Sequence, residues 1–440
     1  MQDSTTGQDV EAIIAALEAN VNVMQHTEYR ELLERLLHHT RTTDDSYLYP
    51  LFTKRGVQVL SSHALDDRTP NYRIALRCLN NVLARSIPTR QIFVDEDYPE
   101  RVVNLMKIGT PDDELATASL LLHSSVHTTL DLTTSFEHYD LADTINKNIL
   151  RHAQLSTITT DEPASALASL RLLSTLAIQY EAQAHRFLPT LHPILDMLST
   201  AAILSPPLQP PVSLLVSCLA SIPIEQARSF SDSGVDRLMH ILLLALDSAP
   251  PPREKELLPL FMALLRIAQS GLSRTRERLS EHLLPTSNDR DEPLGKGVSL
   301  PHRVLKLSGS SVEAELRELI LLVFFALSDR DPARFVRQVG YGNAAGFMAA
   351  KGIHFPQDEL ERSQESESGH DFNPVTGQNW HSESDQLLTP MSAEEREREA
   401  ERLFVLFERL RSTGVVDVEN PVAQMQRTGQ LEELPDDTSE

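Results

Sequence analysis

The feature that most constrains the fold of this chain is a series of amphipathic helical patterns, which runs from the N-terminus to about residue 355. In each pattern apolar residues recur every three or four positions, as in a helix that buries one face. Turn-forming residues, often proline, separate the patterns, and no convincing run of alternating strand residues occurs. The clearest patterns are Asp9–Val21, Glu28–His39, Tyr72–Ala84, Pro111–Ser124, Ala164–Tyr180, Val235–Leu246, Lys255–Ala268 and Val312–Leu327.

Length and composition favour a repeat architecture for these helices. The 440 residues exceed one ordinary compact domain, whereas a solenoid grows by packing each repeat on its neighbours. Aromatic residues make up only 5% of the chain, and much of the 41% hydrophobic content is Leu and Ala, which suits stacked helices. The segment lengths fit armadillo and HEAT repeats of about 40–47 residues, although no fixed period can be read. We predict an all-α, armadillo/HEAT-like superhelix (solenoid) over residues 1–355, with an extended concave surface.

The chain changes character after residue 355. Residues 356–440 carry 21 acidic and 7 basic residues, so −14 of the net charge of −23 lies there. Residues 356–390 are rich in Ser, Glu, Asp and Gln, which predicts an acidic flexible linker. An amphipathic pattern over 391–413 predicts a C-terminal helix, and 414–440 is expected to be a mostly disordered tail.

A glycine-rich corner joins the last two helices of the predicted solenoid. Asp331 and Pro332 are typical of a helix start, and the following helix is expected to run to Val339, with Gly340 as its stop. A second helix is expected to begin near residues 343–344. The Gly-x-Gly-x-x-x-Gly spacing could suggest dinucleotide binding, but that motif requires a preceding strand, and a helix precedes it here. A helix–turn–helix corner is the favoured interpretation.

The remaining chemistry indicates a binding protein rather than an enzyme. No Gly-x-Ser-x-Gly, P-loop or His-Glu-x-x-His motif occurs, so we expect no catalytic residues, no metal site and no cofactor. The net charge of −23 argues against nucleic acid as a partner. Cys78 and Cys218 both lie in apolar helical patterns and are predicted to be buried free thiols, which suits the cytosol. The N-terminus lacks a signal-peptide pattern, and no apolar run is long enough to span a bilayer.

Three ordered motifs carry a resemblance to a known family. The segment FVRQVGYGNAAGFMAAKG, NPVTG at Asn373–Gly377 and the helical pattern Met391–Gly414 closely resemble corresponding segments of the synembryn family, in the same order. Asn71–Leu105 is similar to the early repeats of that family, with a fungal character. Members of the family are guanine-nucleotide exchange factors and folding chaperones for heterotrimeric G-protein α subunits (Gα).

The resemblance gives a function to a polar stripe on the helix near residues 70–86. Arg73, Arg77, Asn81 and Arg85 recur every four residues, and from the residues alone this is most simply a solvated helix face. The resemblance implies instead that the concave surface holds the C-terminal helix of Gα near these residues, with Arg41 as a further basic position. Arginine and asparagine suit this task, because they can bond a free carboxylate and helix-end carbonyls.

The glycine-rich corner is a second candidate surface. The resemblance implies that Arg334, Arg337, Tyr341 and Asn343 border the distal end of the groove. Equally, these residues could simply form the turn of the last repeat.

Two candidate sites fall in the C-terminal segments. The resemblance favours contact between the helix 391–413 and the nucleotide-binding domain of Gα, and Leu403, Phe404 and Phe407 are the expected contact residues. Candidate phosphosites in the linker are Ser363, Ser366 and Ser368, whose phosphates could dock on a basic patch of the solenoid. The alternative is an unmodified, solvated linker.

The expected function is therefore that of an exchange factor and folding chaperone for Gα in its nucleotide-free or GDP-bound form. We expect a cytoplasmic monomer that reaches the membrane and the cell cortex only through Gα. One alternative is an armadillo-type scaffold without exchange activity. Another is a nucleotide-dependent enzyme that uses the glycine-rich corner, which would bind nucleotide by itself.

Overall fold

The structure is a computed structural model that describes residues 3–19, 26–42, 44–69, 71–155, 164–249, 254–309, 314–353 and 377–379. In these ranges the chain forms α-helices and short 3-10 helices joined by turns, and no β-sheet. It divides into two compact units. Unit 1 comprises Met1–His282 and Glu313–Leu327, and unit 2 comprises Leu283–Val312 and Ser328–Glu440.

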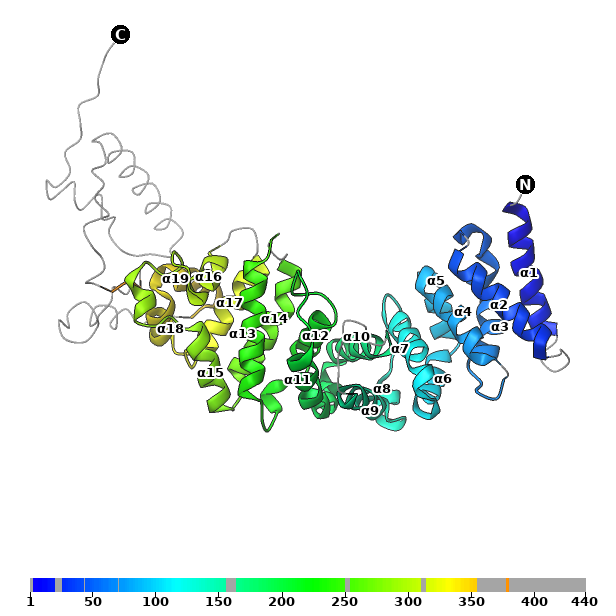
Figure 1. Ribbon diagram of the computed structural model, residues 1–440, viewed down its shortest axis with the longest axis horizontal. Coiled ribbons are helices and arrows are strands. Elements are labelled where there is room, and N and C mark those ends of the chain that lie inside the picture. The colour runs from blue at the N-terminus through cyan, green and yellow to red at the C-terminus, as the bar shows by residue number, and fades with distance from the viewer. Residues whose placement is uncertain are drawn as a thin grey trace, which may run out of the picture. The chain divides into compact units, whose positions relative to one another are not determined.

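Unit 1 is built from helices that follow one another in chain order (Figure 1). Its α-helices are α1 (Asp3–Ala19), α2 (His26–Thr42), α3 (Lys54–Ala64), α4 (Tyr72–Arg85), α5 (Ile87–Asp95), α6 (Tyr98–Ile108), α7 (Pro111–Ser125), α8 (Thr133–His138), α9 (Leu141–Gln154), α10 (Ala164–Gln179), α11 (Leu191–Thr200), α12 (Val212–Ser221), α13 (Asp232–Asp247), α14 (Glu254–Gln269), α15 (Ser273–Leu283, whose last residue lies in unit 2) and α17 (Ala314–Leu327). The 3-10 helices are η1 (Asp45–Tyr47), η2 (Tyr49–Phe52), η3 (Glu181–Thr190) and η4 (Ile224–Gln226).

The helices of unit 1 pack in two layers. In the first row, α2, α4, α7, α10, α12, α14 and α17 each contact the next helix of the row. A second set of helices packs against this row: α3 packs on α4, α6 on α7, α9 on α10 and α11 on α12. This two-layer stacking of neighbours is the arrangement of a helical-repeat solenoid, so the predicted all-α fold class is confirmed.

The spacing between successive helices of the first row is irregular. These helices begin at residues 26, 72, 111, 164, 212, 254 and 314, so their starts are 46, 39, 53, 48, 42 and 60 residues apart. The longest interval contains the first segment of unit 2, Leu283–Val312, between α15 and α17. This variation explains why no fixed repeat period can be read from the sequence.

All eight helical patterns singled out in the sequence correspond to helices, with ends that differ by a few residues. The start of α7 shows why the local signals succeed. The Asp113 carboxylate accepts hydrogen bonds from the backbone N–H and the hydroxyl of Thr110, at 2.9 and 3.0 Å, and Pro111 needs no hydrogen-bond partner in the first turn.

Unit 2 contains η5 (Asn288–Asp291), α16 (Leu300–Ser308), α18 (Pro332–Val339) and α19 (Tyr341–Lys351). The predicted helix–turn–helix corner is confirmed. Asp331 caps α18 by accepting hydrogen bonds from the backbone N–H groups of Ala333 and Arg334. Gly340 has φ of 80°, which a side chain would disfavour, and α19 begins directly after it, a little earlier than predicted. A helix precedes Gly340, and Gly342 and Gly346 lie inside α19, so the strand that a Rossmann-type fingerprint requires before its glycines is missing here.

The core is mostly aliphatic, with a few fully buried phenylalanines such as Phe93, Phe187 and Phe261. Cys78 and Cys218 are free and buried, as predicted. Burial raises the pKa of the Cys78 thiol to about 12, so the reactive thiolate is scarce at neutral pH. Within the described part of the chain, no helix combines the length and apolar character needed to cross a bilayer.

Candidate partner-binding surface

The C-terminal half of α4 is fastened to α2 by the polar residues of the predicted stripe. Asn81 donates from Nδ2 to the hydroxyl of Thr40 at 3.0 Å, and Thr40 is only 1% exposed. Arg85 donates to Asp45 Oδ1 at 2.9 Å and to the backbone carbonyl of Arg41 at 3.3 Å. Asn81 and Arg85 therefore join neighbouring helices, whatever else they contact.

The N-terminal half of α4 is fastened to α7 in the same way. Arg73 donates from Nε to Asp113 Oδ1 and from Nη2 to Thr110 Oγ1, each at 2.8 Å. The Tyr72 hydroxyl also donates to Asp113, whose side chain is buried. Burial alone would raise the pKa of Asp113, but the hydrogen bonds from Arg73, Thr110 and Tyr72 outweigh it and leave the pKa below its ordinary value. Asp113 is thus a buried carboxylate paired with Arg73.

Arg77 differs from the other members of the stripe. Its side chain is exposed, and no hydrogen bond or ion pair from it is found within the described residues. Arg73 contacts Asp113, and Asn80 donates to the Ala116 carbonyl at 2.8 Å, so Arg77 lies between two points of contact with α7. Arg41, at the end of α2, is also exposed and leaves its guanidinium without a hydrogen bond among the described residues. Both guanidinium groups can therefore meet a partner without first breaking a hydrogen bond or ion pair among the described residues.

Apolar side chains are exposed on other helices of the same row. Leu115 on α7 is 43% exposed, Ile178 on α10 is 70% exposed and Met262 on α14 is 38% exposed. Leu115 follows directly on the buried acids of α7, between Asp113, which Arg73 contacts, and Ala116, which Asn80 contacts. We define the capture face as Arg41, Arg77 and Leu115, three exposed side chains on helices α2, α4 and α7, which follow one another in the first row.

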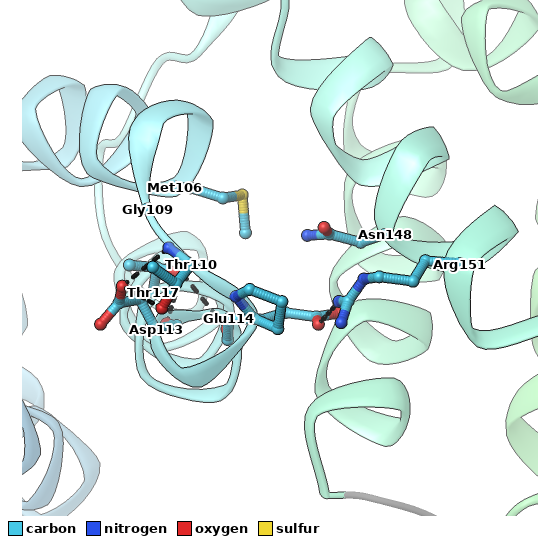
Figure 2. Close-up of a pocket in the computed structure, with 9 residues that line it drawn as sticks. Met106, Gly109, Thr110, Asp113, Glu114, Thr117, Asn148 and Arg151 are labelled. Carbon is cyan, nitrogen blue, oxygen red and sulfur yellow. Dashed lines mark hydrogen bonds and ion pairs between the residues drawn. The ribbon is translucent and has the colours of Figure 1, made fainter. Parts of the chain in front are cut away.

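A polar cavity of about 200 Å³ lies beside α7, lined by α6, α7 and α9. Figure 2 shows Glu114 of α7 and Arg151 of α9 pointing toward each other across it, with Asn148 on the same helix as Arg151. Glu114 pairs with Arg151, accepts from the Ser169 hydroxyl at 2.5 Å, and lies 3.0 Å from His152 Nε2. One carboxylate thus joins α7, α9 and α10.

The cavity is best explained as the edge of a structural network. Burial opposes ionisation of Glu114, but hydrogen bonds from His152 and Ser169 and the charge of Arg151 leave its pKa below the ordinary value. No local signal marks Glu114, because its partners lie 37 to 55 residues away along the chain.

In unit 2, the four residues predicted at the glycine-rich corner take different positions. Arg334 is exposed and pairs with Asp329. Arg337 is exposed, and Tyr341 is 36% exposed. Asn343 donates from Nδ2 to the Val339 carbonyl at 2.8 Å, so it closes the end of α18. Their predicted place at the distal end of a groove stays a prediction, since unit 2 is described by itself.

The C-terminal candidates lie outside the described residues. These are the contact residues Leu403, Phe404 and Phe407 and the candidate phosphosites Ser363, Ser366 and Ser368. The predicted domain boundaries at 355, 390 and 413 likewise stay predictions. Of the NPVTG motif the structure describes only Gly377.

The stacked helices of unit 1 define a helical-repeat (solenoid) protein, a class in which repeats pack side by side and build an extended surface. Residues 32–430 match the model of the family described as guanine nucleotide exchange factor synembryn (Ric8). The chain belongs to this family, so the resemblance found in the sequence is confirmed.

Several curated relatives are similar over part of the chain. A synembryn-like chaperone of Schizosaccharomyces pombe is 27% identical over 224 residues, which cover 48% of this chain and 40% of the relative. The chaperone Ric-8A of Danio rerio is 28% identical over 151 residues, covering 32% and 27% of the two chains. That of Gallus gallus is 29% identical over 155 residues, covering 32% and 28%. The chain thus matches less than half the length of each relative.

Among solved structures, an engineered protein aligns with 82% of this chain at 14% identity and a TM-score of 0.40, which is too low to establish a shared fold.

Proposed function

We propose that this protein binds the α subunit of heterotrimeric G proteins and serves as both its nucleotide exchange factor and its folding chaperone. Membership of the synembryn family supports this proposal, and so do the chaperone names of the relatives. The proposed activity needs no cofactor and no covalent catalysis, because exchange follows from binding alone.

The observation that carries the proposal is the capture face. Arg41 and Arg77 are exposed cations, and Leu115 is an exposed apolar side chain on the helix next to Arg77. An amphipathic helix that ends in a free carboxylate would bring an apolar face to Leu115 and a negative charge to the arginines. The C-terminal helix of Gα has this chemistry, and we infer that it binds here.

The proposed mechanism is differential binding. In Gα, the C-terminal helix packs on the domain that holds the guanine nucleotide, so its capture by the solenoid favours an open domain from which GDP leaves. By thermodynamic linkage, GTP must weaken the complex by the same factor by which the complex weakens GTP binding. A protein that prefers the open, nucleotide-free form of Gα would also hold a folding intermediate of that form.

The remaining features of the proposal concern the C-terminal segments and the cellular location. Leu403, Phe404 and Phe407 are proposed to contact the nucleotide-binding domain of Gα after the C-terminal helix has been captured. We propose a cytoplasmic monomer that reaches the membrane or the cell cortex through Gα, with no nucleic-acid partner.

Gel filtration of the mixed proteins tests the proposed partnership. Gα loaded with GDP and mixed with this protein is expected to elute as a 1:1 complex from which GDP has been lost. Addition of GTPγS with Mg²⁺ is expected to dissociate this complex, because nucleotide and the solenoid compete through linkage. Nucleotide content of the complex peak is measured by absorbance after acid extraction.

The alternative is an armadillo-type scaffold without exchange activity. A stable complex that keeps its GDP and ignores GTPγS would favour the scaffold, and the absence of any complex with Gα proteins of several classes would contradict the proposal altogether.

A further inference from the structure

Unit 2 contains a buried arginine with partners far along the chain. Arg290, in η5, is 7% exposed, and its guanidinium donates to the Gly377 carbonyl at 2.9 Å and to the Arg337 carbonyl at 2.8 Å. Removing a guanidinium from water is unfavourable unless its donors are hydrogen-bonded. The carbonyl of Gly377 therefore belongs to the set of contacts that makes this burial possible, although it lies 87 residues further along the chain.

The contact is made in both directions. The backbone N–H of Asn379 donates to the Arg290 carbonyl at 2.7 Å. The Asn379 side chain donates to the Ser287 carbonyl and to Asp291 Oδ1, each at 3.1 Å. Gln378 is buried and donates from Nε2 to the Asp291 carbonyl at 3.0 Å. Each of the three residues Gly377–Asn379 is thus bonded to the turn that contains η5.

Glycine is the only residue type that fits at position 377 without strain. Its φ is 73°, in the left-handed region, and a Cβ placed there would lie 2.3 Å from Leu294 Cδ1. Close approach of the backbone to the Leu294 side chain is therefore part of the contact. The fit explains a glycine that the sequence shows only as the last letter of NPVTG.

We propose that the turn Ser287–Leu294, which we call the clamp, is a docking site for Gly377–Asn379 and fixes the point from which the C-terminal segment begins. Arg290 is its central positioning residue. The clamp binds Gly377–Asn379 through the close fit of Gly377 against Leu294 and through backbone hydrogen bonds. These contacts distinguish Gly377–Asn379 from the neighbouring acidic sequence.

The consequence for binding rests on the proposed function. Without the clamp, Leu403 is 50 residues from Ile353 at the end of the described helices, and with it Leu403 is 24 residues from Asn379. The composition of residues 356–390 predicts a flexible linker, and effective concentration at the end of a flexible tether falls as about the −3/2 power of its length. We therefore expect the shorter tether to raise the local concentration of the segment 391–413 at bound Gα about threefold. The clamp would thus help the C-terminal segment to reach Gα once the capture face has bound it.

Amide hydrogen exchange of the full chain tests the docking site without Gα. In Gly377→Ala, we expect the Asn379 amide to exchange at least about tenfold faster than in the wild type, because strain and the clash with Leu294 release it. Gly346→Ala is the matched control, since a Cβ at Gly346 meets no atom within 4 Å, and it is expected to leave this exchange unchanged. Wild-type exchange at Asn379 as fast as in Gly377→Ala would overturn the docking site.

Titration with Gα tests the tether. We expect Gly377→Ala to raise the Kd for Gα about threefold in the full chain and to have no effect in a chain that ends at residue 390. An unchanged Kd in the full chain, with faster exchange at Asn379, would overturn the tether role. If wild-type protein fails to bind Gα, the tether role fails together with the proposed function, while the exchange experiment still decides the docking site.

Discussion

Replacing Glu114 with glutamine is expected to lower the free energy of unfolding of unit 1 by about 3 kcal/mol, because it leaves buried donors without a charged acceptor. Glu114 is 3% exposed and accepts from side chains of two neighbouring helices, Arg151 and His152 on α9 and Ser169 on α10. Glutamine keeps the shape but presents an NH₂ group to these donors. The value lies at the low end for a broken buried pair, because Arg151 is 32% exposed and can be solvated.

The effect has a defined pH dependence. The folded-state pKa of Glu114 is lowered, so its contribution is complete above the ordinary carboxyl value of 4.5 and is lost as the pH falls through the lowered folded value. The difference in stability between wild type and Glu114→Gln is therefore expected to be full at pH 7 and to shrink in acid below pH 4.5. Urea unfolding followed by circular dichroism at several pH values measures this.

The loss should also be local, since each helix of a solenoid is stabilised by its neighbours. Hydrogen exchange in Glu114→Gln is expected to accelerate in α7, α9 and α10 and to stay unchanged in α14 and α17. Glu11→Gln is the control. Glu11 is half exposed and pairs with Arg55, which still pairs with Glu18 in the variant. We therefore expect this substitution to lower the free energy of unfolding by about 0.5 kcal/mol or less. Equal losses in the two variants would contradict the assigned role of Glu114.

Replacing Arg77 with glutamate is expected to weaken binding of Gα by about 30-fold, or about 2 kcal/mol, because it places a negative charge opposite the carboxylate of the captured helix. Arg77 is exposed and makes no hydrogen bond or ion pair among the described residues, so the urea midpoint should hardly change. Asn81 is a less specific target, because its hydrogen bond to the buried Thr40 joins α4 to α2. Titration with a peptide of the Gα C-terminus measures the effect directly.

The matched control for Arg77→Glu is Lys147→Glu. Lys147 is exposed on α9, outside the first row, and the substitution changes the net charge of the chain by the same amount. Weakened binding in both variants would show a general effect of charge, and unweakened binding in Arg77→Glu would remove α4 from the capture face.

The local elements of this fold could be predicted from the sequence because their causes are local. Apolar periodicity located the helices, the cap at Asp331 and the stop at Gly340 located the corner, and Cys78 was correctly placed in the core. These signals act within a few residues of where they are read.

The contacts that decide the candidate site could not be predicted, because they join residues far apart in the chain. Arg73, Arg77, Asn81 and Arg85 form one uniform stripe in the sequence. In the structure Arg73 pairs with Asp113 and Arg85 pairs with Asp45. Of the three arginines in the stripe, Arg77 alone is exposed without a hydrogen bond or ion pair among the described residues. For the same reason the clamp could not be predicted: no sequence pattern near Arg290 indicates a hydrogen-bond partner 87 residues away.

The most direct test of the account is the rate at which labelled GDP leaves Gα, measured with and without this protein, for intact Gα and for Gα that lacks its C-terminal residues. Capture of the C-terminal helix predicts faster release from intact Gα and no acceleration for the shortened one, with a reduced effect of Arg77→Glu on intact Gα. Equal acceleration of both forms would contradict the capture mechanism, and no acceleration of either would contradict exchange activity.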